Sequence, residues 1–271
     1  MHWRFSGLKL KELIELIGEK KLKKSLGQNL LINDRVAKEM VEYLEGDDEE
    51  VLEIGPGTGI VTQKLIEKGL KPVCVEIDSD FCRVLKEQFN DRIYLFCMDF
   101  FKFPPQDFKG RLITGSLPYR GAKKMVAHIL LNFPHFTRGT FLLQREVADI
   151  LMAEPKTRDY SPITVITRIR GRVKKIRDVL PASFYPEPRV VSSLVLFEMG
   201  KAPPSSLFYT FLRLAFSSRR KNLRNNLKPV IKSLPEWFPS KKRAEEIYPE
   251  EFLEIFYRLK NEGFLSAISE T

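Results

Sequence analysis

Short apolar runs alternate with helical segments from residue 51 to residue 153, and this alternation constrains the fold more than any other feature of the chain. The runs that predict strands are 51–55, 72–78, 93–99, 111–118 and 139–146, and the segments that predict helices are 60–69, 80–89, 122–131 and 147–153. Strands that follow one another through helices form right-handed crossovers, so the sheet should be mostly parallel. Such a sheet is covered on both faces, which explains why its strands are apolar throughout.

The flanking segments predict further elements. We expect an amphipathic helix over 8–23, a helix over about 35–44 capped by Asn33 or Asp34, a strand over 192–199, a linker at 200–206, and helices over 207–216 and 250–264. In the segment 163–177, Arg168, Arg170, Arg172 and Lys174 occupy every second position, which predicts a strand with four cations on one face. The chain should then comprise an N-terminal helical extension (1–22), an α/β domain (23–200) and a C-terminal helical domain (201–271).

A glycine-rich turn, EIGPGTG at residues 53–59, joins the first strand of the alternating region to its first helix. At the carboxyl edge of a parallel sheet, such a turn lets a ligand approach the backbone closely. Its G-x-G-x-G spacing differs from the G-x-G-x-x-G of dinucleotide-binding proteins, which argues against an NAD-dependent oxidoreductase.

Two carboxylates follow the turn at the ends of the next strands. Glu76 lies where a carboxylate can accept both hydroxyl groups of a ribose, and Asp99 lies where one can accept an exocyclic amine. With the turn, they predict an adenosine pocket without a phosphate subsite, which suits S-adenosylmethionine. The alternative is a plain turn with acids that cap helices.

The fourth strand ends in Ser116-Leu117-Pro118-Tyr119. Methylation of an adenine amine needs hydrogen-bond acceptors on its N–H groups, because the nitrogen lone pair is otherwise delocalised into the ring. The Ser116 hydroxyl and the Leu117 carbonyl can accept these bonds, and Tyr119 can stack on the purine. This chemistry requires no metal, and the alternative is a simple turn in which Pro118 ends the strand.

Together these segments resemble the small-subunit ribosomal RNA adenine dimethyltransferases of the KsgA type. The resemblance runs from about Lys23 to Arg224 and is carried by KKSLGQNLL (23–31), VLEIGPGTG (51–59), VEID (75–78), GSLPY (115–119), LLQREVA (142–148), ASFYPEPRVVSS (182–193) and, more weakly, FSSRRKNLRNNL (216–227). It implies a Rossmann-like class I S-adenosylmethionine-dependent methyltransferase domain with a seven-stranded, mostly parallel sheet, followed by a small all-α domain.

The resemblance also implies an activity and its site. The activity is dimethylation of the N6 amines of two adjacent adenosines in a 3′-terminal hairpin loop of small-subunit (16S) ribosomal RNA, within the pre-30S or small subunit. The implied cofactor contacts are Asn29, Leu31, Gly55, Gly57, Glu76, Asp99 and Ser116. The implied catalytic residues are Ser116, Leu117, Pro118, Tyr119 and Phe184, with Tyr119 and Phe184 on either side of the flipped adenine.

The chain departs from the family pattern at three places. Ser116 stands where the family usually has asparagine, Arg120-Gly121-Ala122 replaces Asn-Ile-Ser/Ala, and Ser218 replaces a glutamine. Serine offers one acceptor oxygen, so we expect slower methyl transfer rather than an inactive protein.

The formal net charge of +10 favours an anionic partner, and two clusters without acids stand out at 168–177 and 217–228. The predicted RNA contacts are Lys23, Lys24, Arg168, Arg170, Arg172, Arg219, Arg220, Lys221 and Arg224. The alternative is a solvated charged surface without a polyanion.

Three cysteines without a C-x-x-C pair predict free thiols and a cytoplasmic protein, and no apolar stretch is long enough for a membrane span. We expect a monomer without a metal. Two other functions compete with the leading one: methylation of a large-subunit adenine of the macrolide-resistance type, and a weakly catalytic ribosome-assembly or nucleic-acid-binding relative.

Overall fold

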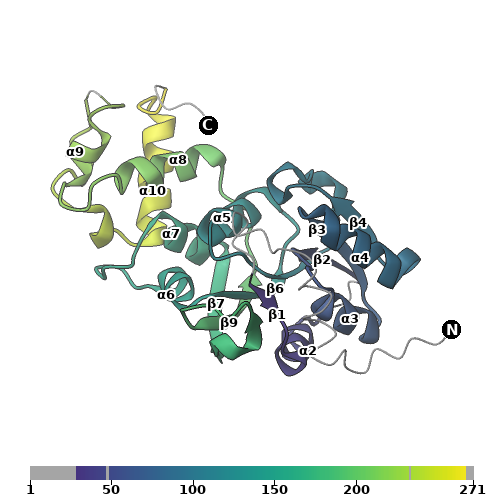
Figure 1. The fold of residues 1–271 in the computed structure, drawn as a ribbon. Coiled ribbons are helices and arrows are strands. Elements are labelled where there is room, and N and C mark those ends of the chain that lie inside the picture. The colour runs from purple at the N-terminus through teal and green to yellow at the C-terminus, as the bar shows by residue number, and fades with distance from the viewer. Residues whose placement is uncertain (1–28, 47–48, 232, 267–271) are drawn as a thin grey trace. The chain divides into compact units, whose positions relative to one another are not determined.

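The computed structural model describes residues 29–46, 49–231 and 233–266 (Figure 1). The expected helix over 8–23 and the lysines Lys23 and Lys24 lie outside these residues. The chain divides into two compact units, the first formed by residues 1–125, 135–145 and 174–198 and the second by residues 126–134, 146–173 and 199–271. No helix among the described residues is long and apolar enough to cross a membrane.

The described part of the chain contains the expected seven-stranded, mostly parallel sheet. In sheet order its strands are β4 (Tyr94–Cys97), β3 (Lys71–Glu76), β2 (Glu50–Ile54), β5 (Leu112–Ser116), β6 (Arg138–Gln144), β9 (Ser192–Met199) and β7 (Gly171–Val179). The strands from β4 to β6 pair in parallel, and β6 pairs with β9 in antiparallel register. The chain runs outward from β2 through β3 to β4 and returns to β5 on the other side of β2, so the strand order switches between β2 and β5. Ligands of doubly wound folds bind at such a switch point.

The helices that follow the strands of the alternating region begin and end close to the predicted residues. The described α-helices are α2 (Asp34–Glu42), α3 (Ile60–Glu67), α4 (Ser79–Phe89), α5 (Ala122–Asn132), α6 (Arg145–Met152), α7 (Pro162–Arg170), α8 (Ser206–Ala215), α9 (Leu223–Leu227) and α10 (Pro249–Asn261). Asn33 caps α2 as predicted, because its side chain accepts the Val36 N–H.

Helices α2, α3 and α4 cover one face of the sheet. On this face Cys74, Glu53, Thr114 and Thr140 lie opposite one another across four neighbouring strands. Thr140 donates to the Met40 carbonyl of α2 at 2.9 Å, and Thr62 of α3 donates to Glu53 at 2.7 Å. The buried polar row is therefore satisfied partly by the helices above it and partly within the sheet, where Thr114 donates to the Thr140 carbonyl.

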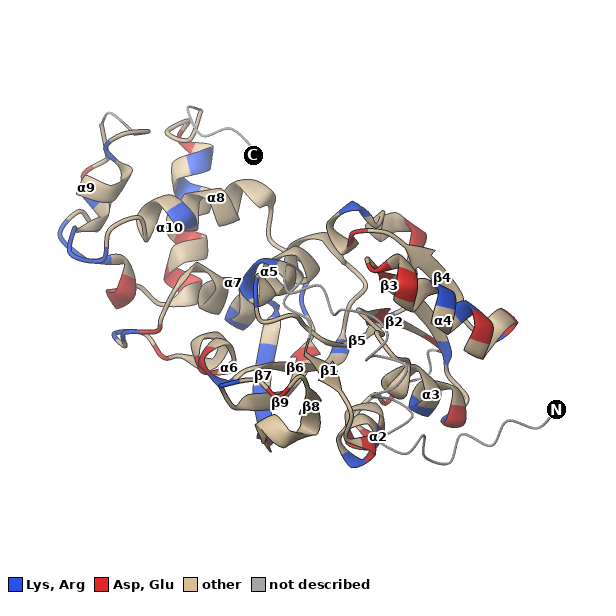
Figure 2. Cartoon of the chain, viewed as in Figure 1, with Lys and Arg blue, Asp and Glu red and all other residues tan. Residues whose placement is uncertain are grey.

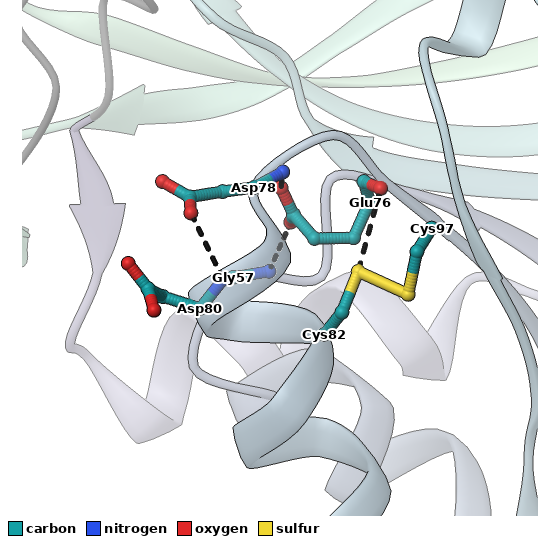
Figure 3. Close-up of a disulfide and its surroundings, with 6 residues drawn as sticks. All are labelled: Gly57, Glu76, Asp78, Asp80, Cys82 and Cys97. Atoms are coloured by element: carbon teal, nitrogen blue, oxygen red, sulfur yellow. Dashed lines mark hydrogen bonds between the residues drawn. A yellow bond between two sulfur atoms is a disulfide. The ribbon is translucent and has the colours of Figure 1, made fainter.

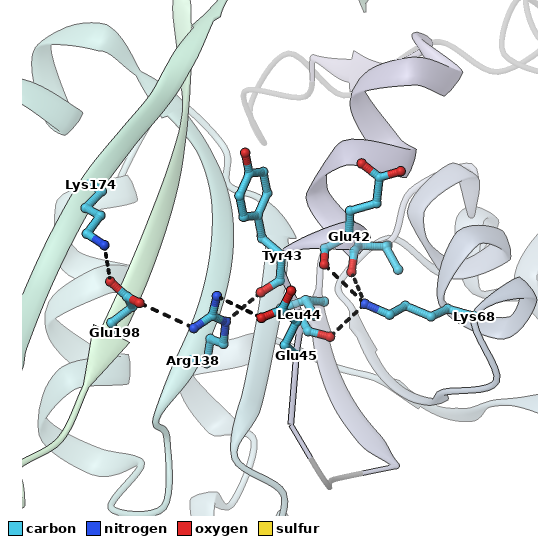
Figure 4. A network of polar contacts seen from close by, with 9 residues as sticks. Glu42, Tyr43, Leu44, Glu45, Lys68, Arg138, Lys174 and Glu198 are labelled. Atoms are coloured by element: carbon cyan, nitrogen blue, oxygen red, sulfur yellow. Dashed lines mark hydrogen bonds and ion pairs between the residues drawn. The ribbon is translucent and has the colours of Figure 1, made fainter.

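A network of cations attaches α2 to the sheet (Figure 4). Arg138 of β6 donates to the Tyr43 carbonyl at the end of α2 and pairs with Glu198, which also binds Lys174. Lys68 donates to three carbonyls around the same helix end, those of Val41, Glu42 and Leu44. Carbonyls at the end of the helix thus bind cations, which is the favourable place for positive charge, and α2 is held where the chain enters the sheet.

The prediction of one strand over 163–177 was wrong, because a helix and a strand share this segment. Pro162 occupies the first turn of α7, and the Ser161 N–H donates to Thr164, so the helix begins where the sequence offers a proline and a cap. The helix ends at Arg170, and β7 begins at Gly171. The period-two spacing of arginines therefore spans a helix end and does not define one face.

Within the second unit, α7 packs against α8 and α10 (Figure 1). Tyr160, before α7, donates its hydroxyl to the Ile247 carbonyl before α10 at 2.9 Å. Aromatic side chains fill the centre of this unit, where Phe211 lies between Phe252 and Phe256. These contacts explain why α7 belongs to the same unit as the C-terminal helices, whereas the sequence placed it in the α/β domain.

Candidate functional site

A cavity of about 300 Å³ lies at the carboxyl ends of β2, β3 and β5, where the strand order switches. Its lining comes entirely from the first unit. The predicted site residues among its lining are Asn29, Leu31, Gly55, Glu76, Asp99, Ser116, Leu117, Pro118 and Tyr119. The parallel order of the strands therefore brings the predicted residues from Gly55 to Tyr119 to one cavity.

The glycine turn and Glu76 form one wall of this cavity. Glu76 is buried, and its two carboxylate oxygens accept the N–H groups of Gly57, at 3.0 Å, and Asp78, at 2.9 Å (Figure 3). Gly57 itself has a φ of 55° and does not line the cavity. Gly57, predicted as a cofactor contact, therefore acts indirectly: its N–H holds the Glu76 carboxylate, which lines the wall. Burial raises the pKa of Glu76.

The walls fit the methionine and ribose of S-adenosylmethionine. Gly55 has a φ of 65°, and a Cβ added there would meet no atom within 4 Å, so the backbone at this position borders open space. A carboxylate fixed by two backbone N–H groups still has lone pairs for ribose hydroxyls, because each of its oxygens accepts more than one hydrogen bond.

The opposite end of the cavity combines one acid with apolar side chains. Asp99 caps the 3₁₀ turn η3 (Phe100–Lys102), with one carboxylate oxygen accepting the Phe101 N–H at 3.0 Å. Phe100 and Ile77 line the same cavity. Sequence reasoning missed Ile77, although its place was visible in the sequence, directly after the strand-end acid Glu76. The structure leaves this large apolar side chain 52% exposed. An acceptor beside apolar surfaces suits an adenine ring.

The Ser116–Tyr119 element forms a third wall. Leu117 is fixed by its N–H, which donates to the Leu142 carbonyl of β6 at 3.1 Å. The Tyr119 hydroxyl shares a hydrogen bond of 2.7 Å with Ser192, and burial raises the pKa of this phenol, so it stays neutral. The Ser116 hydroxyl makes no hydrogen bond to any residue that the structure describes. The Ser116 hydroxyl can therefore accept a hydrogen bond from a ligand. It lies beside the Tyr119 ring, whose position is fixed by the hydrogen bond to Ser192.

The N-terminal segment reaches the cavity through a short pairing. Strand β1 (Leu30–Leu31) pairs in antiparallel register with β8 (Phe184–Tyr185). Phe184 is 3% exposed, packs in the hydrophobic core with Leu31 and does not line the cavity. The structure therefore does not bring Phe184 opposite Tyr119, because the ring is used to hold β1 against the domain.

The predicted RNA contacts fall into two groups. Arg170 is fully buried in the second unit and donates to the Leu130 carbonyl at 3.0 Å, so its assignment to RNA is corrected to a structural role. Burial lowers the pKa of Arg170 to about 10. Arg168 binds the Met152 and Ala153 carbonyls and Glu154, and Arg219 binds the Thr157 carbonyl and Glu245. These arginines connect loops within the unit.

The remaining predicted cations that the structure describes are exposed. Arg220, Lys221 and Arg224 make no side-chain hydrogen bond or ion pair with any described residue, and Figure 2 shows basic residues gathered in the turn between α8 and α9. Arg172 is also exposed, on strand β7. No group of three or more His, Cys, Asp or Glu side chains in the described ranges could hold a metal ion.

The prediction of three free thiols was wrong, because Cys82 of α4 and Cys97 of β4 form a disulfide (Figure 3). Their Cα atoms are 6.0 Å apart, within the range that a disulfide spans. The spacing of the two cysteines in the sequence does not reveal the pair. They meet because the chain turns back after helix α4 and strand β4 runs beside that helix. The bridge lies beside the cavity, since Phe81 and Met98, which neighbour the two cysteines, both line it. Cys74 is the free cysteine and is buried.

Thiol titration checks this bridge. Denatured protein without reductant should show one thiol, from Cys74, and reduction should expose all three cysteines. Reduction of the folded protein should lower its free energy of unfolding by roughly 2–3 kcal/mol, because the bridge no longer restricts the unfolded chain. The double variant Cys82→Ser/Cys97→Ser serves as control and should be insensitive to reductant. Three thiols before reduction would contradict the bridge.

Glu53 lies beneath the glycine turn and contributes to the lining of the cavity. It is 2% exposed and accepts hydrogen bonds from Thr62, at 2.7 Å, and from the Cys74 thiol. Burial raises the pKa of Glu53 to about 7 from its usual 4.5. The folded protein therefore holds a proton that the unfolded chain releases at lower pH, and stability should fall as pH rises from about 4.5 to about 7.

Glu53→Gln removes this dependence. Between pH 5 and pH 8 the wild-type free energy of unfolding should fall by roughly 2–3 kcal/mol more than that of the variant, which has no proton to lose. Urea denaturation of both proteins at the two pH values measures the difference. Equal pH dependence in the two proteins would show that Glu53 ionises as an ordinary glutamate.

Comparisons with known proteins agree on one family. A family model described as ribosomal RNA adenine dimethylase matches residues 19–261. A ribosomal RNA small subunit methyltransferase A of Mesomycoplasma hyopneumoniae (strain J) is 34% identical over 230 residues, which cover 83% of this chain and 86% of that protein. The protein of the same name from Clostridium botulinum (strain Kyoto / Type A2) is 32% identical over 257 residues, covering 86% of this chain and 92% of the relative.

Solved structures share the fold. The crystal structure of a dimethyladenosine transferase from Plasmodium falciparum matches with a TM-score of 0.71 and 24% identity, covering 87% of this chain and 98% of that one. The crystal structure of the 23S rRNA methyltransferase ErmE matches with a TM-score of 0.61 and 22% identity, covering 86% of this chain and 100% of that one. Both likenesses concern the fold, that is, the arrangement of helices and strands.

Proposed function

The chain belongs to the ribosomal RNA adenine dimethylase family, and from this premise we propose that it dimethylates the N6 amines of two adjacent adenosines in a 3′-terminal hairpin loop of small-subunit (16S) ribosomal RNA. The methyl donor is S-adenosylmethionine, which supplies an electrophilic methyl group at its sulfonium. The partner is the pre-30S or small ribosomal subunit, on which the protein acts as a monomer during subunit biogenesis.

One observation carries this proposal. A hydroxyl without a hydrogen-bond partner among the described residues and an aromatic ring line one wall of a cavity, and the other walls of the same cavity suit adenosine. Ser116 ends β5 and Tyr119 lies just beyond it, whereas Gly55 follows β2, the strand beside β5, and Glu76 ends β3, on the far side of β2. An amine acceptor and a methyl donor need such a common cavity, because the transfer is direct.

The chain's own residues then divide the work. Glu76 accepts hydrogen bonds from the ribose hydroxyls, and Asp99 accepts one from the amine of the cofactor's adenine. Asn29 and Leu31 cover the cofactor from the N-terminal segment. The Ser116 hydroxyl and the Leu117 carbonyl accept the N–H groups of the target amine, which directs its lone pair out of the ring. Tyr119 stacks on the target base and recovers part of the cost of flipping it, which is lower in an unpaired loop.

RNA affinity comes from the exposed cations of the second unit. Arg220, Lys221 and Arg224 contact phosphates, with Arg172 and the lysines Lys23 and Lys24 as further contacts. Such contacts contribute affinity and salt dependence but little sequence information, so the splayed adenosines and the shape of the loop supply selectivity.

Methyl transfer from labelled S-adenosylmethionine to small subunits that lack the modification tests the function. Digestion and mass analysis should find dimethyladenosine at two adjacent positions, and large subunits in a parallel reaction should stay unlabelled. Label in the large subunit alone would favour the macrolide-resistance activity, which the names of the curated relatives do not support. Binding of cofactor and subunit without transfer would indicate an assembly factor instead.

A further inference from the structure

We propose that Arg120 and Lys124 bind the RNA backbone at the mouth of the cavity, on the phosphates that flank the adenosine inside it. This inference rests on the proposed function, since it names residues that position the same substrate. Both residues belong to the first unit, and the proposal is independent of the exposed cations Arg220, Lys221 and Arg224 of the second unit.

Arg120 follows Tyr119 directly and lines the cavity. Its side chain is exposed and makes no hydrogen bond or ion pair with the residues that the structure describes. An adenosine stacked on Tyr119 would enter with its phosphates behind it, at the solvent side of the cavity. A guanidinium beside the stacking ring is the group best suited to bind them, because its planar donors match phosphate oxygens.

Lys124 lies at the same mouth of the cavity, where it contacts Phe101 on another wall. Its ammonium nitrogen is 4.8 Å from the centroid of the Phe101 ring, and Phe101 is a 36% exposed lining residue from the adenine end of the cavity. A cation over an aromatic face is attracted to it without being neutralised. Lys124 is thereby positioned at the rim, and its charge remains available to an anion.

The electrostatics of helix α5 point to the same partner. Its first turn contains Lys123 and Lys124 and no acidic residue. The N-terminal end of a helix carries partial positive charge and favours acids, so cations there are unfavourable in the free protein. A phosphate bound here makes the electrostatic interaction favourable, because the anion is attracted to the helix end, to Arg120 and to Lys124.

The double variant Arg120→Gln/Lys124→Gln tests the proposal in the subunit methylation assay. We expect the KM for subunits to rise about ten-fold or more, since charged hydrogen bonds are lost, while kcat at saturating subunit and the Kd for S-adenosylmethionine stay close to wild type. The slope of log affinity against log salt should fall by roughly 1.4, the share of two single-strand phosphate contacts. Lys124→Arg should retain the wild-type slope.

Lys109→Gln is the matched control, because Lys109 is an exposed cation of the same unit that does not line the cavity. Its KM and salt slope should equal those of the wild type. An unchanged salt slope in the double variant would overturn the proposal, and so would a loss confined to cofactor affinity, which would make the two residues a cover for the cofactor. If wild-type protein fails to methylate subunits, the proposed function fails, yet the salt slope of direct subunit binding still decides the role of Arg120 and Lys124.

Discussion

Replacing Ser116 with alanine should slow methyl transfer by about 10²- to 10³-fold, because one fixed acceptor on the reacting amine is lost. The side chain of Ser116 lines the cavity beside Tyr119, and its hydroxyl has no competing partner among the described residues. Its removal should leave the fold intact, since no hydrogen bond of the protein depends on it. Single-turnover transfer from labelled S-adenosylmethionine to small subunits measures the rate without product release.

Ser116→Asn provides the matched control for this variant. The amide oxygen is an acceptor on a longer side chain, so transfer should be retained or faster. The Kd for S-adenosylmethionine, measured by calorimetry, should change little in either variant. A wild-type rate in Ser116→Ala would mean that the Leu117 carbonyl alone aligns the amine. A strong gain in Ser116→Asn over a nearly inactive wild type would instead support the assembly-factor function.

The sequence predicted the α/β architecture because its signals are local. Apolar runs bounded by Gly69 or Pro118 define strands and helices within a few residues, and Asn33 caps a helix by a bond to its own first turn. The carboxyl ends of parallel strands meet at one edge, so the strand-end acids Glu76 and Asp99 could be assigned to a single cavity before the structure was known.

The predictions that were wrong depend on contacts between distant segments. Arg170 resembles an RNA-binding residue in the sequence, but its partners are carbonyls about 40 residues away, at Leu130 and Phe133. Cys82 meets Cys97 because a helix and a strand lie side by side. Phe184 is held in the core by its pairing with the N-terminal segment, which residue type alone does not reveal. In each case a long-range partner determines the role, and no local periodicity reports it.

Glu76→Gln should weaken S-adenosylmethionine binding by about 10³-fold, because charged hydrogen bonds to ribose are lost and the turn that lines the cavity is disturbed. The reason lies in the two acceptor oxygens of the carboxylate. One accepts from Gly57 and the other from Asp78, so the amide group of glutamine must direct its own N–H₂ at one of these donors. The replacement is similar in size but reverses one hydrogen bond within the cavity wall. Calorimetric titration with S-adenosylmethionine measures the effect.

The pH dependence of binding identifies the carboxylate as the cause. Because burial raises the pKa of Glu76, the wild-type group takes up a proton at higher pH than a solvent-exposed glutamate, and its affinity for the cofactor should fall as the solution is acidified. Glu53 also titrates beside the cavity, so the comparison is made in a Glu53→Gln background. Asp80→Asn removes an equal charge from a residue outside the lining and should bind like the wild type. If Glu76→Gln bound the cofactor as tightly as Asp80→Asn, the ribose would be held by the backbone of the turn, and the buried carboxylate would serve only to shape it.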